Sequence, residues 1–296
     1  MSAFWIILTG SLVAVTCSLL GCFLVLRKMS MMGDAISHAV LPGIVLAYLV
    51  TGSGASLPVL TGAAGMGLLA AYLIEAFQKK GKLQTDASIG LTFTSLFACG
   101  VILISLFARN IHLDADCVLY GEIAYVPLDS LVIGGTYLGP RAVWLLGALL
   151  VGVVSVIVAG YRGLLLTTFD PAYAVTLGVS ATFWHYLLVS MVSLACVISF
   201  ESVGAILVVA MLIVPASAAY LLTSRLSHML ILASLLGILG AFGGYYLAFW
   251  LDASIAGAMT SVMGLEFLMA LMLVTLKRPS GNAVHVQNNN PVPEKS

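Results

Sequence analysis

Two residues that can bind a metal ion, Asp34 and His38, lie four positions apart in a segment apolar enough to cross a bilayer. Residues four apart share one face of an α-helix, and an ionisable side chain inside a membrane span costs about 2.5–3.5 kcal/mol on insertion scales. Pro42 has no N–H, so it leaves the carbonyl of His38 without its helical donor. This set of a carboxylate, an imidazole and a carbonyl suits a divalent metal such as Mn, Fe or Zn.

A simpler interpretation of the same two residues stays open at this point. Asp34 can act as the N-cap of a helix, where a carboxylate is favoured. His38 can then be an ordinary side chain packed against a neighbouring helix. The two interpretations differ in what they require of Asp34, because asparagine caps a helix as well as aspartate does.

The composition defines the class of protein. The chain has 296 residues, of which 61% are hydrophobic and 8% are charged. These values exclude a soluble globular protein and predict an all-α, polytopic membrane protein. The formal net charge is zero and no basic, aromatic-rich run occurs, so we expect no nucleic-acid partner. The five cysteines include no C-x-x-C pair, so neither a disulfide framework nor a thiolate metal site is indicated.

Nine apolar stretches approach the roughly 20 residues that a spanning helix needs. The first lacks a basic start and a cleavage motif, so we interpret it as a retained span. Residues 184–222 carry one charge, Glu201, and are too long for a single span, so we expect a turn at Glu201. The predicted spans are Phe4–Leu26, Ala35–Val50, Leu57–Phe77, Ala87–Phe107, Ala142–Ala159, Trp184–Phe200, Val203–Leu222, Met229–Leu251 and Ile255–Leu276.

The basic residues predict the orientation of these spans. If the N-terminus is outside and the C-terminus cytoplasmic, only Arg109 and Arg141 fall outside, and the other ten Lys and Arg residues lie in the cytoplasm, as the positive-inside rule requires. The cytoplasmic set is Arg27, Lys28, Lys79, Lys80, Lys82, Arg162, Arg225, Lys277, Arg278 and Lys295.

The segments between the spans contain fewer signals. The outer segment Arg109–Arg141 holds His112, Asp114, Asp116, Glu122 and Asp129; it can attract cations, but we favour an interfacial helix without a chemical role. On the cytoplasmic side, Asp170 as N-cap, Pro171 at the first helical position and Gly178 as a stop predict a short helix outside the membrane. Residues 1–278 form the predicted permease domain, and the polar residues 279–296 a disordered cytoplasmic tail.

Several catalytic motifs are missing from the sequence. No G-x-x-x-x-G-K-[ST] loop occurs, so the chain lacks the usual phosphate cradle for ATP, and no H-E-x-x-H or G-x-S-x-G motif suggests a hydrolase. Of the other ionisable residues near predicted spans, Glu75, Asp86, His185 and Asp252 lie at span ends, where a charge is cheap. Glu201 and Glu266 remain candidates.

Four sequence blocks resemble a known family, the ABC-3 permease subunits of bacterial ABC transporters for manganese, zinc and iron. The resemblance covers about residues 4–278, and the first block is highly specific. Residues 119–127 (LYGEIAYVP) and 200–203 (FESV) look like the manganese branch. The four blocks are LRKMSMMGDAISHAVLPG at 26–43, TDASIG at 85–90, FDPAYA at 169–174 and VGAILVVAMLIVP at 203–215.

The resemblance implies roles for particular residues. Asp34 and His38 would contribute to the metal path, and Glu201 would join them. The predicted spans put Asp34 near the cytoplasmic start of its helix and Glu201 near the outer turn, so the three meet only if the second span is broken or displaced towards the membrane centre. The coupling helix that docks on the ATPase would comprise Asp170, Pro171, Tyr173, Leu177 and Gly178.

The resemblance also implies an assembly in a bacterial plasma membrane. A separate ATP-binding subunit would hydrolyse ATP, so this chain is not itself an enzyme and holds no permanent cofactor. Two permease subunits, identical or related, would enclose one pathway, and an extracellular solute-binding protein would deliver the ion.

We therefore expect the permease of a divalent-metal importer, with manganese as cargo and zinc or iron as the close alternative. A rival is an ion-coupled secondary transporter that uses Asp34 and His38 as a proton relay, but we see no repeat symmetry between the halves. An intramembrane enzyme would need a nucleophile or a metal-held water, and no motif supplies either.

Overall fold

Long helices account for almost all of the chain. The computed structural model describes residues 2–51, 56–107, 123–133 and 136–277. In chain order the elements are α1 (Ser2–Leu26), α2 (Met32–Thr51), α3 (Ser56–Lys79), α4 (Thr85–Phe107), η1 (Ile123–Leu128), β1 (Ser130–Ile133), β2 (Thr136–Pro140), α6 (Arg141–Ala159), α7 (Tyr161–Phe169), α8 (Pro171–Thr176), α9 (Ala181–Val203), α10 (Ala205–Leu222), α11 (Leu226–Leu251) and α12 (Ile255–Lys277). The prediction of an all-α membrane protein is confirmed.

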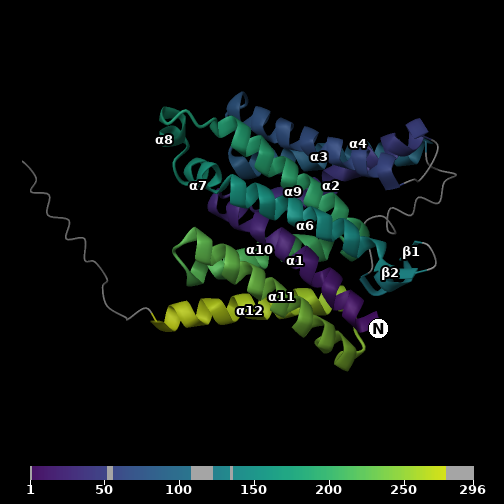
Figure 1. Cartoon of the computed structure of the whole chain (residues 1–296). Coiled ribbons are helices and arrows are strands. Elements are labelled where there is room, and N and C mark those ends of the chain that lie inside the picture. Colours follow the sequence, from purple (N-terminus) through teal and green to yellow (C-terminus); the bar gives the residue numbers. More distant parts are fainter. Residues whose placement is uncertain (1, 52–55, 108–122, 134–135, 278–296) are drawn as a thin grey trace, which may run out of the picture.

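The helices form two packed groups joined through α9 (Figure 1). In the first group α2 packs against α3 and α4. In the second, α1 packs against α10 and α11, and α12 against α10 and α11. Helix α9 contacts members of both groups, and its buried residues belong to the central hydrophobic core. The start of α1 and the end of α12 lie at opposite ends of the molecule, and α7 and α8 lie at the α12 end (Figure 1).

Eight helices in the described ranges are long and apolar enough to span a membrane, namely α1, α2, α4, α6, α9, α10, α11 and α12. The remaining predicted span, Leu57–Phe77, lies within α3, whose 24 residues rise about 36 Å, enough to cross the hydrocarbon region. The count of nine spans and the external N-terminus remain predictions.

The chain turns at Gly204, three residues after the position that the sequence suggested. Gly204 has a φ of +82° and a ψ of 156°, a region that is essentially open only to glycine. Glu201 instead lies in the last turn of α9. The expectation of a turn at Glu201 was therefore wrong, because backbone freedom and not the charge decides where the helix ends.

Helix α7 was not expected as a separate element. It follows α6 after Gly160, and both Gly160 and Gly163 face the indole of Trp184 in α9. A Cβ atom added to Gly163 would lie 2.3 Å from Cε2 of Trp184, and one added to Gly160 would lie 2.4 Å from Cζ3. The indole thus packs on bare backbone, and this contact fixes α7 against the first turn of α9.

The described part of the predicted outer segment differs from the expected interfacial helix. It consists of the six-residue 3-10 helix η1, which contacts α1, and an antiparallel pair of strands, β1 and β2. Residues 108–122, with His112, Asp114, Asp116 and Glu122, lie outside the described residues, as does the predicted tail 279–296.

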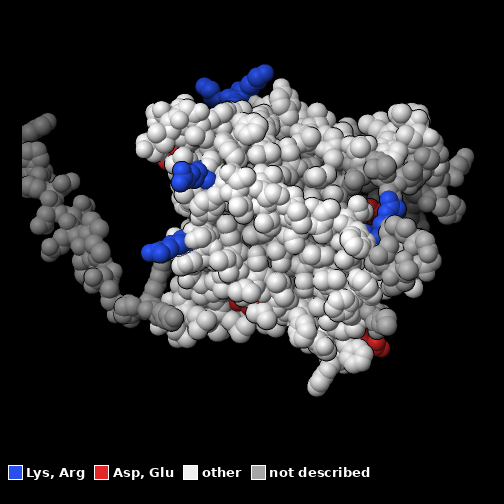
Figure 2. All heavy atoms as spheres, in the orientation of Figure 1, with Lys and Arg blue, Asp and Glu red and all other residues white. Residues whose placement is uncertain are grey.

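Basic residues are concentrated at one end of the bundle. Figure 2 shows Lys and Arg side chains mostly on the side where α7 and α8 lie. Arg27 contacts α7, Arg162 lies on α7, and Arg225 lines the same hollow as Phe169 at the end of α7. This grouping agrees with the orientation expected from the positive-inside rule.

That orientation predicts which ends of the bundle a membrane-impermeant thiol reagent reaches in intact cells. A cysteine replacing Asp252, between α11 and α12, should be labelled from outside, and one replacing Lys80, between α3 and α4, should be labelled only after the cells are permeabilised. The unaltered chain gives the background from its own cysteines. The reverse pattern would overturn the predicted topology.

Candidate metal site and coupling helix

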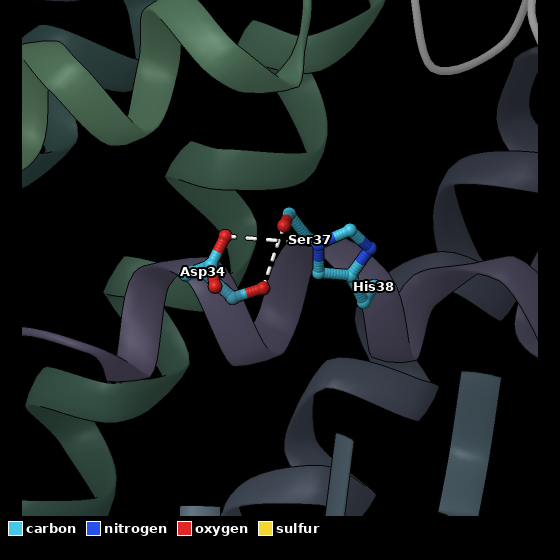
Figure 3. Close-up of polar contacts among 3 residues, drawn as sticks. All are labelled: Asp34, Ser37 and His38. Carbon is cyan, nitrogen blue, oxygen red and sulfur yellow. Dashed lines mark hydrogen bonds and ion pairs between the residues drawn. The ribbon is translucent and has the colours of Figure 1, made fainter. Parts of the chain in front are cut away.

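Asp34 and His38 face the same way from the first two turns of α2 (Figure 3). Nε2 of His38 lies 3.7 Å from Oδ1 of Asp34, and each side chain is 38% exposed. Zinc, for example, takes carboxylate and imidazole ligands at about 2.0–2.2 Å, so two donors 3.7 Å apart can bind one ion between them. The predicted shared face is confirmed, and the pair has the geometry of a partial metal site.

The capping interpretation of Asp34 does not fit the helix boundary. Helix α2 begins at Met32, so Asp34 is its third residue and lies inside the first turn. A carboxylate there is still favoured by the helix dipole. The buried hydroxyl of Ser37 donates to the backbone carbonyl of Asp34 at 2.6 Å (Figure 3). Asp34 therefore lies within the first turn of α2 and is not its N-cap.

Two phenylalanines of α4 surround the imidazole of His38. The ring of Phe93 lies 5.7 Å from it in a tilted arrangement, and the ring of Phe97 lies 5.5 Å away, edge-on at 81°. The packing interpretation of His38 is thus correct as a contact, and it does not exclude a role as a ligand. Sequence reasoning missed both residues, although their spacing of four places them on one face of α4.

Glycines bring the neighbours of α2 close to this site. A Cβ atom at Gly100 of α4 would lie 3.0 Å from Cδ of Pro42. On the opposite side, a Cβ atom at Gly43 would lie 2.3 Å from the carbonyl oxygen of Gly62 in α3. A larger side chain at Gly43 would meet the backbone of α3 and move a helix, whereas at Gly100 the neighbouring groups would have to give by a few tenths of an ångström. Helix α2 therefore packs closely between α3 and α4.

Helix α2 starts beside the middle of α10, and the depth of Asp34 in the membrane remains a prediction. A Cβ atom at Gly33 would lie 3.0 Å from the side chain of Leu212, and one at Gly21 would lie 1.8 Å from the carbonyl oxygen of the same residue. Leu212 is in the middle of α10, and Gly21 lies five residues before the end of α1. The chain therefore turns back along α1 before α2 begins.

Glu201 does not complete the site within one chain. In the described part of the chain, no three His, Cys, Asp or Glu side chains come close enough together to hold a metal ion. Glu201 lies in the last turn of α9, and Glu266 lies on α12, which packs against α10 and α11. The expected trio of Asp34, His38 and Glu201 is therefore reduced to a pair.

The predicted short helix after α7 is present and capped as expected. Oδ1 of Asp170 accepts from the N–H of Tyr173 at 2.9 Å, Pro171 is the first helical residue, and Gly178 has a φ of +77°. Ala174 is buried, whereas the side chains of Tyr173 and Leu177 are about half exposed.

A hollow of about 540 Å³ lies next to this helix. Phe169, Leu26 and the connection between α10 and α11 line it. Together with the exposed side chains of α8 it forms a surface with both apolar and polar residues at this end of the bundle. Such a surface typically marks a site where another protein docks.

Comparison with known proteins identifies relatives over almost the whole chain. The model of the ABC 3 transport family matches residues 2–274. The chain is 51% identical to the manganese transport system membrane protein MntD of Bacillus subtilis, over 90% of each chain. It is 43% identical to the zinc transport system membrane protein TroD of Treponema pallidum, over 90% of this chain and 72% of the other. Among solved structures, PsaBC from Streptococcus pneumoniae in complex with Fab matches with a TM-score of 0.74 and 31% identity, over 90% of each chain.

The ligand hypothesis predicts opposite results for the same Asp→Asn substitution at two acidic residues, Asp34 and Asp86. Asp34→Asn and His38→Ala should each lower metal accumulation by at least about tenfold, because each removes a ligand and the helix forms without them. Asp86→Asn alters an exposed acidic residue in the first turn of α4 and should leave accumulation unchanged.

Accumulation is measured by elemental analysis of cells that contain equal amounts of each membrane-inserted variant. If Asp34→Asn behaves like Asp86→Asn, the carboxylate acts only on the helix dipole and the ligand hypothesis fails.

Proposed function

Because the chain belongs to the ABC 3 transport family, we propose that it is the membrane-spanning permease subunit of an ATP-driven importer of divalent metal cations, with manganese as cargo. The observation that carries this proposal is the Asp34–His38 pair, with its donors 3.7 Å apart on a helix that packs against α3 and α4. An ionisable pair in a helix that can span a membrane is costly and points to an ion path. The similarity to MntD, which is named for manganese transport, supports the choice of metal.

The pair acts as a transient set of ligands. An ion moving along a path needs a site that binds well enough to accept it and weakly enough to release it. One chain supplies a carboxylate and an imidazole, and manganese prefers oxygen-rich, octahedral surroundings. We propose that water and a second permease subunit, identical or related, supply the remaining ligands. The partial exposure of both side chains leaves space for them.

Zinc is the second candidate cargo, because the chain is also similar to the zinc permease TroD. Intrinsic affinity at a site with nitrogen and oxygen ligands favours Zn²⁺ over Mn²⁺. Selection of manganese would therefore depend on geometry and on delivery by an extracellular solute-binding protein. Elemental analysis of cells with and without this chain decides between the two: a deficit in manganese alone supports the first proposal, and a deficit in zinc alone contradicts it.

A separate subunit supplies the energy for transport. The sequence has no phosphate-binding loop, and α8 with its C-cap residue Leu177 presents Tyr173, Val175 and Leu177 at the surface. We propose that an ATP-binding subunit docks on these apolar side chains and that α8 is the coupling helix. Asp170, Pro171 and Gly178 define its two ends and so fix the direction in which its side chains point.

Charged substitutions on α8 test this docking. Tyr173→Asp and Leu177→Asp should each reduce co-purification of the ATP-binding subunit and lower ATP-dependent metal entry by at least about tenfold, because they place a charge in an apolar contact. The matched control is Tyr125→Asp in η1, an exposed tyrosine that lies at the other end of the bundle. The control should bind the ATP-binding subunit normally, and equal loss in all three variants would contradict docking on α8.

Reconstitution in proteoliposomes separates this function from a secondary transporter. With the purified ATP-binding subunit and solute-binding protein, metal should enter only when ATP is supplied. Metal entry at the same rate without ATP, and its loss when the proton gradient collapses, would contradict the proposal.

A further inference from the structure

One side chain ties the segment before α8 to the end of α1. Nε of Arg27 donates to Oγ1 of Thr168 at 3.1 Å, and Nη2 donates to Oγ1 of Thr167 at 3.0 Å. The two threonines directly precede Phe169, the last residue of α7. Asp170, the N-cap of α8, follows Thr168 by two positions. These two hydrogen bonds bridge about 140 residues of sequence.

Both sides of this bridge are held firmly. The backbone N–H of Arg27 donates to the carbonyl of Phe23 at 3.0 Å, which fixes Arg27 to the last turn of α1. The buried hydroxyl of Thr167 donates in turn to the carbonyl of Gly163 at 2.8 Å. A guanidinium holds its donors in a rigid planar fork, so the geometry of the two bonds is well defined.

The positive-inside rule alone does not explain why the guanidinium of Arg27 is partly buried. Burial lowers the pKa of its guanidinium to about 10, so the group keeps its charge at neutral pH although it is partly removed from water. The adjacent Lys28 is exposed and already supplies a positive charge at this end of the helix. The hydrogen bonds from Arg27 to Thr167 and Thr168 account for a half-buried arginine at this position.

The turn after Arg27 leads directly to the metal-binding pair. Only residues 28–31 separate Arg27 from Met32, where α2 begins. Within the turn, Lys28 donates to Val25, Met29 to Leu24, and Met32 to Met29, all through backbone N–H groups. Backbone hydrogen bonds thus hold this turn, and Asp34 is the third residue of the helix that follows.

We propose that Arg27 is a positioning residue that couples movement of α8 to movement of the Asp34–His38 pair, an inference that rests on the proposed function of α8 as the docking site of the ATP-binding subunit. When α8 and the end of α7 shift, the two hydrogen bonds pull the turn at residues 27–31 with them. Both metal ligands lie on α2, so the pair moves as a unit relative to the other groups that hold the ion. Its own spacing of 3.7 Å is unchanged.

The test measures metal ions transported per ATP hydrolysed, in proteoliposomes that contain the purified complex and the solute-binding protein. Arg27→Lys keeps the charge but lacks the two-armed fork. Thr168→Val removes one acceptor with little change in shape. Each should lower the ratio of transport to hydrolysis by roughly three- to thirtyfold, the range of residues that carry coupling between sites. Hydrolysis per complex and co-purification of the ATP-binding subunit should stay unchanged.

Two control variants make this result specific. Arg162→Lys changes an exposed arginine of α7 and should keep the ratio of the unaltered complex. Thr168→Ser retains the hydroxyl acceptor and should restore the ratio that Thr168→Val loses. A purely structural role of Arg27 predicts that transport and hydrolysis fall together, so an unchanged ratio in Arg27→Lys and Thr168→Val would overturn the inference. If the unaltered complex moves no metal with ATP, the proposed function itself fails, and this inference fails with it.

Discussion

The organisation of this protein depends on holding a carboxylate and an imidazole within an apolar helical bundle. Ionisable groups are expensive inside a membrane span. The fold places this pair near the centre of α10, because α2 starts beside it. The contacts of Gly21 and Gly33 with Leu212 define this position. Asp34 lies in the first turn of α2, close to the positive end of its helix dipole, where a negative charge is stabilised.

Glycines and aromatic rings surround the Asp34–His38 pair. Gly43 and Gly62 allow α2 and α3 to touch through their backbones, and Gly100 does the same for α4 against Pro42. Phe93 and Phe97 then form an aromatic wall beside His38. Close backbone contacts are how helices associate in a membrane, where lipid removes the hydrophobic driving force between them. They also make α2 move together with its neighbours, which suits a transporter that works by rearranging packed elements.

The α7–α8 end of the bundle has a different chemistry from its centre. It presents half-exposed apolar side chains, a hollow beside Phe169 and most of the basic residues seen in Figure 2. The centre holds groups that suit an ion, and this end holds groups that suit a protein. The division agrees with a transporter in which one chain forms the path and another hydrolyses ATP. The bridge from Arg27 to Thr167 and Thr168 is the described contact that joins the segment before α8 to the turn before α2.

The sequence by itself determined the fold class, the shared face of Asp34 and His38, the cap at Asp170 and the family, because hydropathy, helical spacing and capping are local properties. Only the tertiary structure decided that α2 starts beside the middle of α10, since hydropathy gives the limits of a span and not its offset from its neighbours. It also excluded Glu201 from the site within one chain and moved the turn to Gly204. The bridge at Arg27 was beyond sequence reasoning for the same reason: its partners are about 140 residues apart, and packing alone brings them together.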